Sequence, residues 1–304
     1  LCYNRVKGGA DMIYIDDIIN KIIGFIILAI LFTVTFAMPA VMTIWNIISL
    51  TPKKDMIKHR RRKDIATLLL GLLLTIIMLG LMSSYHWDEP VMIGGDFFSI
   101  LHEPFSSDYA LSLLLYAAVP IACMMIAGRE KLLPPLVGAF CIGGIYGGMV
   151  LCFFYTSHLL GGLFERKFVV VYLAFLFIYV LNYFLMAVRI IGDNVKRYLE
   201  YFRENDIQPR SVIGVWAMNL LSKASGWVWF PLICLIPLTG VLIIICIFLG
   251  QGPWGIIKAF TETSDWTYST MISPPPEHYT GHYLCTVAVN GHEKLVKPTR
   301  LGIR

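Results

Sequence analysis

Residues 136–160 read LVGAFCIGGIYGGMVLCFFYTSHLL, a run without Asp, Glu, Lys or Arg. A helix of about 20 apolar residues crosses a hydrocarbon core of roughly 30 Å, so this run is long enough to span a membrane. Five more runs of similar composition are residues 22–48, 65–82, 109–127, 168–188 and 227–249. The sequence therefore predicts an all-α fold, a polytopic helical membrane bundle of six transmembrane helices.

The composition of the whole chain agrees with this prediction. Of its 304 residues, 57% are hydrophobic and 15% are charged, and the mean hydropathy is +0.69. Soluble domains carry about 45–50% apolar and about 25% charged residues, so a soluble enzyme is excluded. Disorder is excluded too, because it requires low hydrophobicity. The net charge of +5 comes from basic residues beside the apolar runs, where such residues set orientation, so no nucleic-acid partner is expected.

The charges of the loops predict the orientation. Residues 51–64 contain seven Lys and Arg, whereas residues 83–108 contain none and carry five carboxylates. Because basic loops stay in the cytoplasm, the N-terminus and residues 83–108 should lie outside, and with six spans so should the tail. Residues 211–226 are interpreted as an interfacial helix. The alternative, a hairpin with the sixth span that returns the tail to the cytoplasm, would bury Lys223 in the bilayer.

Polar and small residues inside the runs have two interpretations each. Asn182 and His158 are expected to form interhelical hydrogen bonds rather than to bind a substrate. Gly143 and Gly147, like Gly144 and Gly148, have the spacing that lets two helices approach closely. They predict tight packing within one chain, or alternatively a homo-oligomer through the Gly143/Gly147 face.

Two segments next to the runs are also informative. Apolar residues recur at Val195, Tyr198, Leu199 and Phe202 among charged ones, which predicts an amphipathic helix that lies on the membrane surface or extends the fifth span. Residues 85–98 combine a histidine, carboxylates and aromatics. They suit cation binding or acid–base chemistry, but an ordinary loop at the headgroups has the same composition and is preferred.

The tail contains the densest group of potential ligands. Four weak candidates for a metal site are His278, His282, Cys285 and His292. Residues 283–289 resemble a strand, and Asn290-Gly291 favours a hairpin turn, so a small β-hairpin is expected there. The ligand spacing differs from that of known structural zinc sites, and an apolar strand disfavours a thiolate. A structural role for Cys285 is therefore predicted over zinc binding or nucleophilic catalysis, and no cofactor is expected.

Both ends of the chain look incomplete as natural termini. Residues 1–11 are interpreted as a translated leader, residues 12–250 as the transmembrane domain, and residues 251–304 as a soluble tail that continues past Arg304. The tail contains GHYLCTVA at residues 281–288, Gly291-His292 and KPTRLG at residues 297–302. These residues resemble a bacterial family of multipass membrane proteins that is known as a domain of unknown function. The resemblance implies a bacterial cytoplasmic membrane and no assigned activity.

Three classes of function stay open at this point. A non-enzymatic membrane protein with a partner-binding or envelope-assembly role is preferred, because the runs contain no Asp, Glu, Lys or Arg. Its expected partners are the lipid bilayer and another membrane or envelope protein. Kinked, glycine-rich spans are also typical of a transporter or channel subunit. A membrane-embedded enzyme that uses Cys285 or the histidines is the third class.

Overall fold

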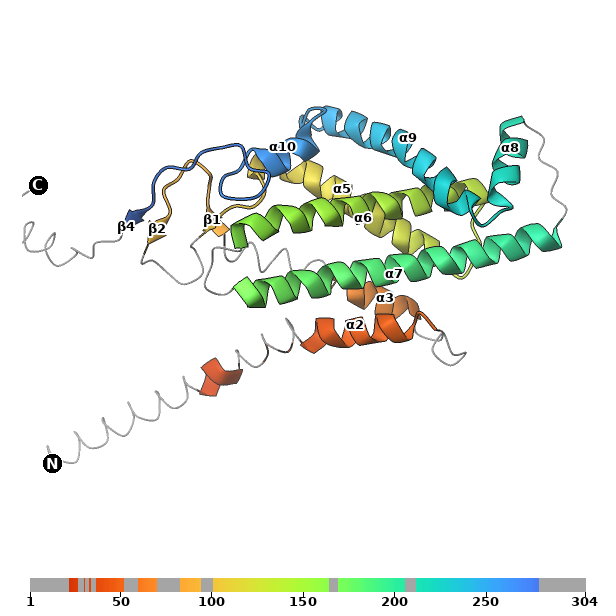
Figure 1. Ribbon diagram of the computed structural model, residues 1–304, viewed down its shortest axis with the longest axis horizontal. Helices are drawn as coiled ribbons and strands as arrows, with labels where there is room; N and C mark the ends of the chain where they lie inside the picture. The colour runs from red at the N-terminus through yellow and green to blue at the C-terminus, as the bar shows by residue number, and fades with distance from the viewer. Residues whose placement is uncertain are drawn as a thin grey trace, which may run out of the picture.

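The computed structural model describes residues 22–26, 30, 33, 37–51, 60–69, 83–93, 101–163, 169–205 and 212–278. The helices are α2 (Met38–Ile48), α3 (Arg60–Thr67), α5 (Ala110–Ala127), α6 (Pro135–Leu163), α7 (Val169–Glu204), α8 (Val212–Leu221), α9 (Gly226–Phe248) and α10 (Gly255–Thr261), with a 3₁₀ turn, η4 (Ser107–Tyr109). The short strands β1 (Ser83–Tyr85) and β3 (Leu101–His102) pair in parallel, as do β2 (Met92–Ile93) and β4 (Glu277–His278). Helix α6 packs against α5, α7 and α9, and Figure 1 shows the strands and α10 at one end of this bundle.

Four helical segments are long and apolar enough to cross a membrane by length and composition: Ser107–Ala127, Pro135–Gly162, Leu176–Glu204 and Gly226–Phe248. They coincide with the last four predicted runs, so the prediction of a helical bundle that fits a membrane protein is confirmed for them. Of the first run, the structure describes α2, a shorter apolar helix. Most of the second run and the predicted β-hairpin in the tail lie outside the described residues, so these features stay predictions.

The surface of α9 fits a bilayer. Ile233, Ile236 and Ile244 are each at least half exposed although they are large and apolar. Exposed tryptophans, which favour membrane interfaces, flank this surface at Trp229 and at Trp254. A rise of 1.5 Å per residue puts about 30 Å between Trp229 and the end of α9, which matches the hydrocarbon core.

The amphipathic segment extends the fifth span, because α7 continues without a break to Glu204. Tyr198 is fully buried and stacks on Trp227 of α9, with ring centroids 4.4 Å apart. Val195, Leu199 and Phe202 pack around the same cluster. The structure therefore has the extension of the fifth span rather than a separate helix on the membrane surface. The apolar face of the segment packs on the bundle.

Helix α8 fits the predicted interfacial helix better than the hairpin. Its ten residues rise about 15 Å, half of what a crossing needs. The Trp227 indole N–H donates to the carbonyl of Leu221 at 2.8 Å, which holds the end of α8 against the start of α9. Lys223 lies exposed in the turn between the two helices.

The glycines of α6 make close contacts within the chain. A Cβ atom at Gly143 would lie 2.6 Å from the carbonyl oxygen of Pro231 in α9, and one at Gly144 would lie 2.4 Å from Sγ of Cys123 in α5. These contacts confirm the predicted packing role of the stripe. A homo-oligomer through Gly143 and Gly147 stays a prediction.

Polar contacts join α2 and α3 to α7. Asn46 Nδ2 donates to Asn182 Oδ1 at 2.8 Å, and Asn182 Nδ2 donates to Thr43 Oγ1 at 2.8 Å, so the interhelical role predicted for Asn182 is confirmed. Nearer the other end of α7, Arg189 Nη2 donates to Asp64 Oδ1 of α3 at 2.6 Å, and the Arg189 side chain is only 2% exposed. No local sequence pattern predicts this buried ion pair.

Candidate functional site

Segments from both halves of the chain meet next to the first residues of α5 and the last residues of α9. They form a unit that we call the cap, which consists of residues 83–93, 101–109 and 251–278. The Ser106 N–H donates to the carbonyl of Ala259 at 2.9 Å, and Gln251 Nε2 donates to the carbonyl of Asp108 at 3.1 Å. Lys258 Nζ donates to Tyr109 Oη at 3.1 Å and forms an ion pair with Glu262 at 2.9 Å, and these two partners raise the pKa of Lys258 to about 12. Backbone and side-chain contacts thus bind α10 to the start of α5.

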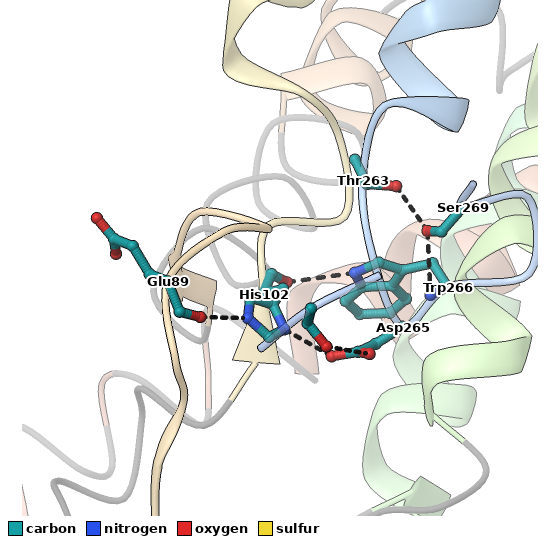
Figure 2. Close-up of polar contacts among 7 residues, drawn as sticks. Glu89, His102, Thr263, Asp265, Trp266 and Ser269 are labelled. Carbon is teal, nitrogen blue, oxygen red and sulfur yellow. Dashed lines mark hydrogen bonds and ion pairs between the residues drawn. The ribbon is translucent and has the colours of Figure 1, made fainter. Parts of the chain in front are cut away.

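The centre of the cap is a buried histidine, His102 (Figure 2). Its Nδ1 lies 2.6 Å from Asp265 Oδ2, and its Nε2 lies 2.8 Å from the carbonyl oxygen of Glu89. A carbonyl and a carboxylate can both accept a hydrogen bond, so each ring nitrogen faces an acceptor. Because both nitrogens are already hydrogen-bonded, this arrangement holds three segments together and leaves no free ring nitrogen for proton transfer.

The loop that carries Asp265 is fixed by further bonds. The Trp266 indole N–H donates to the carbonyl of His102 at 3.2 Å, and Ser273 Oγ donates to Asp265 Oδ1 at 3.2 Å. Ser269 Oγ lies 2.6 Å from Thr263 Oγ1 and accepts a hydrogen bond from the backbone N–H of Trp266 at 3.2 Å (Figure 2). Asp265 has a positive φ of 67°, which asparagine and aspartate tolerate better than most residues. These contacts hold the strained residue in the geometry that reaches His102.

His158 joins the cap to the bundle. Its ring is fully buried near the end of α6, where Nε2 donates to the carbonyl of Pro104 at 2.7 Å and Nδ1 accepts the N–H of Tyr268 at 3.2 Å. The sequence predicted a hydrogen bond between helices. The partners are instead two cap loops, because His158 lies at the helix end that the cap covers.

An apolar cavity of about 520 Å³ lies below the cap, between α5, α6, α9 and α10. Pockets for small ligands have volumes of about 300–1,000 Å³, so the cavity is large enough for one. Its wall includes Pro120 of α5, Gly144 and Phe154 of α6, Leu238 of α9 and Ile257 of α10. The few polar residues on the described part of the wall carry hydroxyls, and none of these described wall residues is Asp, Glu, Lys or Arg.

The profile of the DUF6688 N-terminal domain matches residues 27–277, most of the chain. The chain belongs to the DUF6688 family. The match covers the bundle and nearly the whole cap, including His102 and Asp265. The match does not cover residues 281–302, on which the predicted resemblance was based. It supports an uncharacterised domain family, but neither the location of the resemblance in the tail nor a bacterial origin. No curated protein and no solved structure matches the chain.

The loop of residues 85–98, for which an ordinary headgroup loop was preferred over acid–base chemistry, contains a second histidine cluster. His86 Nδ1 lies 2.5 Å from Asp88 Oδ1, and Nε2 lies 3.4 Å from Glu103 Oε1. The hydrogen bond to Asp88 raises the pKa of His86 and lowers that of Asp88, whereas partial burial raises the pKa of Glu103. Across the described residues, no three His, Cys, Asp or Glu side chains gather in a way that could hold a metal ion.

The metal candidates of the tail are mostly beyond the described part of the DUF6688 chain. His278 contributes its backbone to β4, which pairs with β2, while His282, Cys285 and His292 lie outside the described residues. The residues that organise the cap, His102 and Asp265, were not predicted. They are 163 positions apart and belong to no local motif.

Proposed function

We propose that the chain is a multipass protein of the bacterial cytoplasmic membrane with six transmembrane helices, whose cap faces outward and binds another envelope protein without catalysing a reaction. The contacts of the described residues with one another support the number of spans. Leu68, just after α3, packs with Met124 and Ala127 at the end of α5, whereas β1 pairs with β3 at the opposite end of the bundle. The described residues on either side of the second predicted run thus lie at opposite ends of the bundle, which is what a second span requires.

The distribution of charge supports the orientation. Arg61, Arg129, Arg197 and Lys223 belong to segments at the end of the bundle opposite the cap. The cap contains a single Lys or Arg, Lys258. Basic segments remain in the cytoplasm, so the cap faces outward in this proposal.

The observation that supports partner binding is the surface of residues 271–276. Ile272 is 89% exposed, although it lies outside the candidate spans, and three prolines follow at positions 274–276. The segment is tied at both ends, because the Met271 N–H donates to the carbonyl of Thr263 and the Glu277 N–H donates to the carbonyl of Val91. A fixed, extended, proline-rich segment with an exposed aliphatic side chain is typical of a recognition surface, since little order is lost on binding.

Site-specific photocrosslinking in living cells tests this proposal. A photoreactive amino acid at Ile272 should form a discrete adduct with one envelope protein. The matched control is Phe177, which is 68% exposed on α7, inside the apolar part of the bundle, and should yield no such adduct. The absence of a discrete adduct at Ile272, or the same adduct at both positions, would contradict the proposal.

A further inference from the structure

The cavity below the cap has the length of one bilayer leaflet. It follows α6 from Gly144 to Phe154, ten residues that rise about 15 Å. The hydrocarbon core of a bilayer is roughly 30 Å thick, so this length is about that of a single leaflet. The cavity is closed at the cap end by α10 and Tyr268, and it extends inward to the level of Pro120 and Leu235.

The cavity opens toward the lipid-facing surface. Val150 and Phe154 line it and are also about half exposed, although both belong to a helix that fits a membrane span. An occupant therefore enters from the surface of α6 that faces lipid. Among the described residues the wall contains no charged group that would recognise an ion or a sugar, so we expect an occupant that is apolar over most of its length.

Polar groups are found at the cap end of the wall. Thr261 and Tyr268 line the wall there, and Ile257, another wall residue, precedes Lys258, the single Lys or Arg of the cap. Lys258 is partly exposed, with its side chain at 43% exposure, beside Glu262. A long apolar slot that ends at Thr261 and Tyr268, with Lys258 next to a wall residue in α10, fits an apolar chain with a polar head at that end.

We propose that this cavity binds one acyl chain of a glycerophospholipid from the leaflet next to the cap, with the ester and phosphate at the level of Thr261 and Lys258. The proposal requires that α5, α6 and α9 span the membrane, but it does not depend on partner binding by the cap. The missing side chain of Gly147 provides much of the space. A Cβ atom there would touch only Leu235 Cδ1, at 3.0 Å, so a larger side chain would extend into the slot.

Native mass spectrometry of the full chain, purified from membranes in a mild detergent, measures the bound lipid. The wild type should retain one phospholipid per chain. Gly147→Leu and Thr239→Phe, which fill the slot from two different helices, should each lower this occupancy by about tenfold. Gly240→Leu is the matched control, because Gly240 has no atom within 4 Å of an added Cβ and does not line the cavity.

A photoreactive phospholipid with a diazirine near the end of its acyl chain provides a second measurement, which needs no variant to fold. In wild-type proteoliposomes it should label peptides that contain Gly144 or Leu235 at the inner end of the slot, well above those with the lipid-facing residues Leu114 and Phe177. Equal labelling of all these peptides would overturn the proposal. So would wild-type occupancy in a slot-filling variant whose melting temperature and elution profile match the control, or detergent as the only ligand retained.

Discussion

His102 and Asp265 are 163 residues apart in the chain, yet His102 Nδ1 lies 2.6 Å from Asp265 Oδ2. The contact connects strand β3, which precedes α5, with the loop that follows α10. The same ring also reaches the carbonyl of Glu89, so one buried side chain joins three segments of the cap. The cap is therefore a folded unit rather than two independent loops.

Replacement of Asp265 by Ala should destabilise this unit. The substitution leaves a buried ring N–H without its acceptor, which costs about 1–3 kcal/mol of the free energy of unfolding. Thermal unfolding in detergent would show a lower Tm. Glu89→Gln is the control, because the bond to His102 uses the Glu89 backbone carbonyl, and it should leave the Tm unchanged. Equal Tm values for Asp265→Ala and wild type would contradict this role.

Replacement of Asp64 should lower the free energy of unfolding more than replacement of Asp265 does. The carboxylate is the acceptor found for Arg189, whose Nε and Nη1 have no hydrogen-bond partner among the described residues. Breaking a buried ion pair costs about 3–5 kcal/mol, because it leaves an uncompensated charge. Asp64→Ala should thus unfold at a clearly lower temperature or denaturant concentration, and Asp64→Leu with Arg189→Leu should recover part of the loss. The exposed Arg62→Ala serves as control, and an Asp64→Ala protein as stable as Arg62→Ala would be inconsistent with the pair.

The His86 ring should titrate above its ordinary pKa of 6.5, because Asp88 accepts a hydrogen bond from its charged form. A raised pKa in the folded state means that the stabilisation is complete below pH 6.5 and is lost as the pH rises through the folded-state value. NMR titration of the ring measures this. Asp88→Asn should move the midpoint down toward 6.5, and an unchanged midpoint would show that the Asp88 carboxylate does not set it.

Two glycine substitutions should change the free energy of unfolding in opposite directions. Gly143→Ala should destabilise by about 1–3 kcal/mol, because its Cβ would overlap the rigid backbone carbonyl of Pro231. Gly192→Ala in α7 has no atom within 4 Å and should stabilise by about 0.5–1 kcal/mol through helix propensity. Melting temperatures of the two variants measure the difference. Equal shifts would mean that α6 and α9 do not pack closely at Gly143.

The sequence predicted the parts of the fold that depend on local composition. The last four runs are helical, because a bilayer-length apolar segment has few alternatives. Three of these helices end close to the predicted bounds, whereas the run at residues 168–188 is continued by α7 to Glu204. The repeat at Val195, Tyr198, Leu199 and Phe202 predicted an apolar face, but the extension of α7 depended on the partner for that face, Trp227, which no local pattern reveals. The pair of His102 with Asp265 was not predictable for the same reason.

The cavity could not be predicted from the sequence either, because it is the space left between four helices. Gly144 and Gly147 indicated close helix approach, and at Gly144 this is what the structure has. The same two glycines also line the cavity. A glycine pattern alone does not distinguish packing from open volume.

The most direct test of the proposed architecture is the sidedness of Arg61, Asp88 and Ile272. Single cysteines at these positions, in a background in which Cys2 and Cys285 are replaced, can be labelled with a membrane-impermeant maleimide in intact cells. Asp88→Cys and Ile272→Cys should be labelled in intact cells, because the proposed orientation puts the cap, which contains both, on the outside. Arg61→Cys should react only after permeabilisation. Labelling of position 61 in intact cells, or of only one of positions 88 and 272, would contradict an outward-facing cap on a six-span bundle.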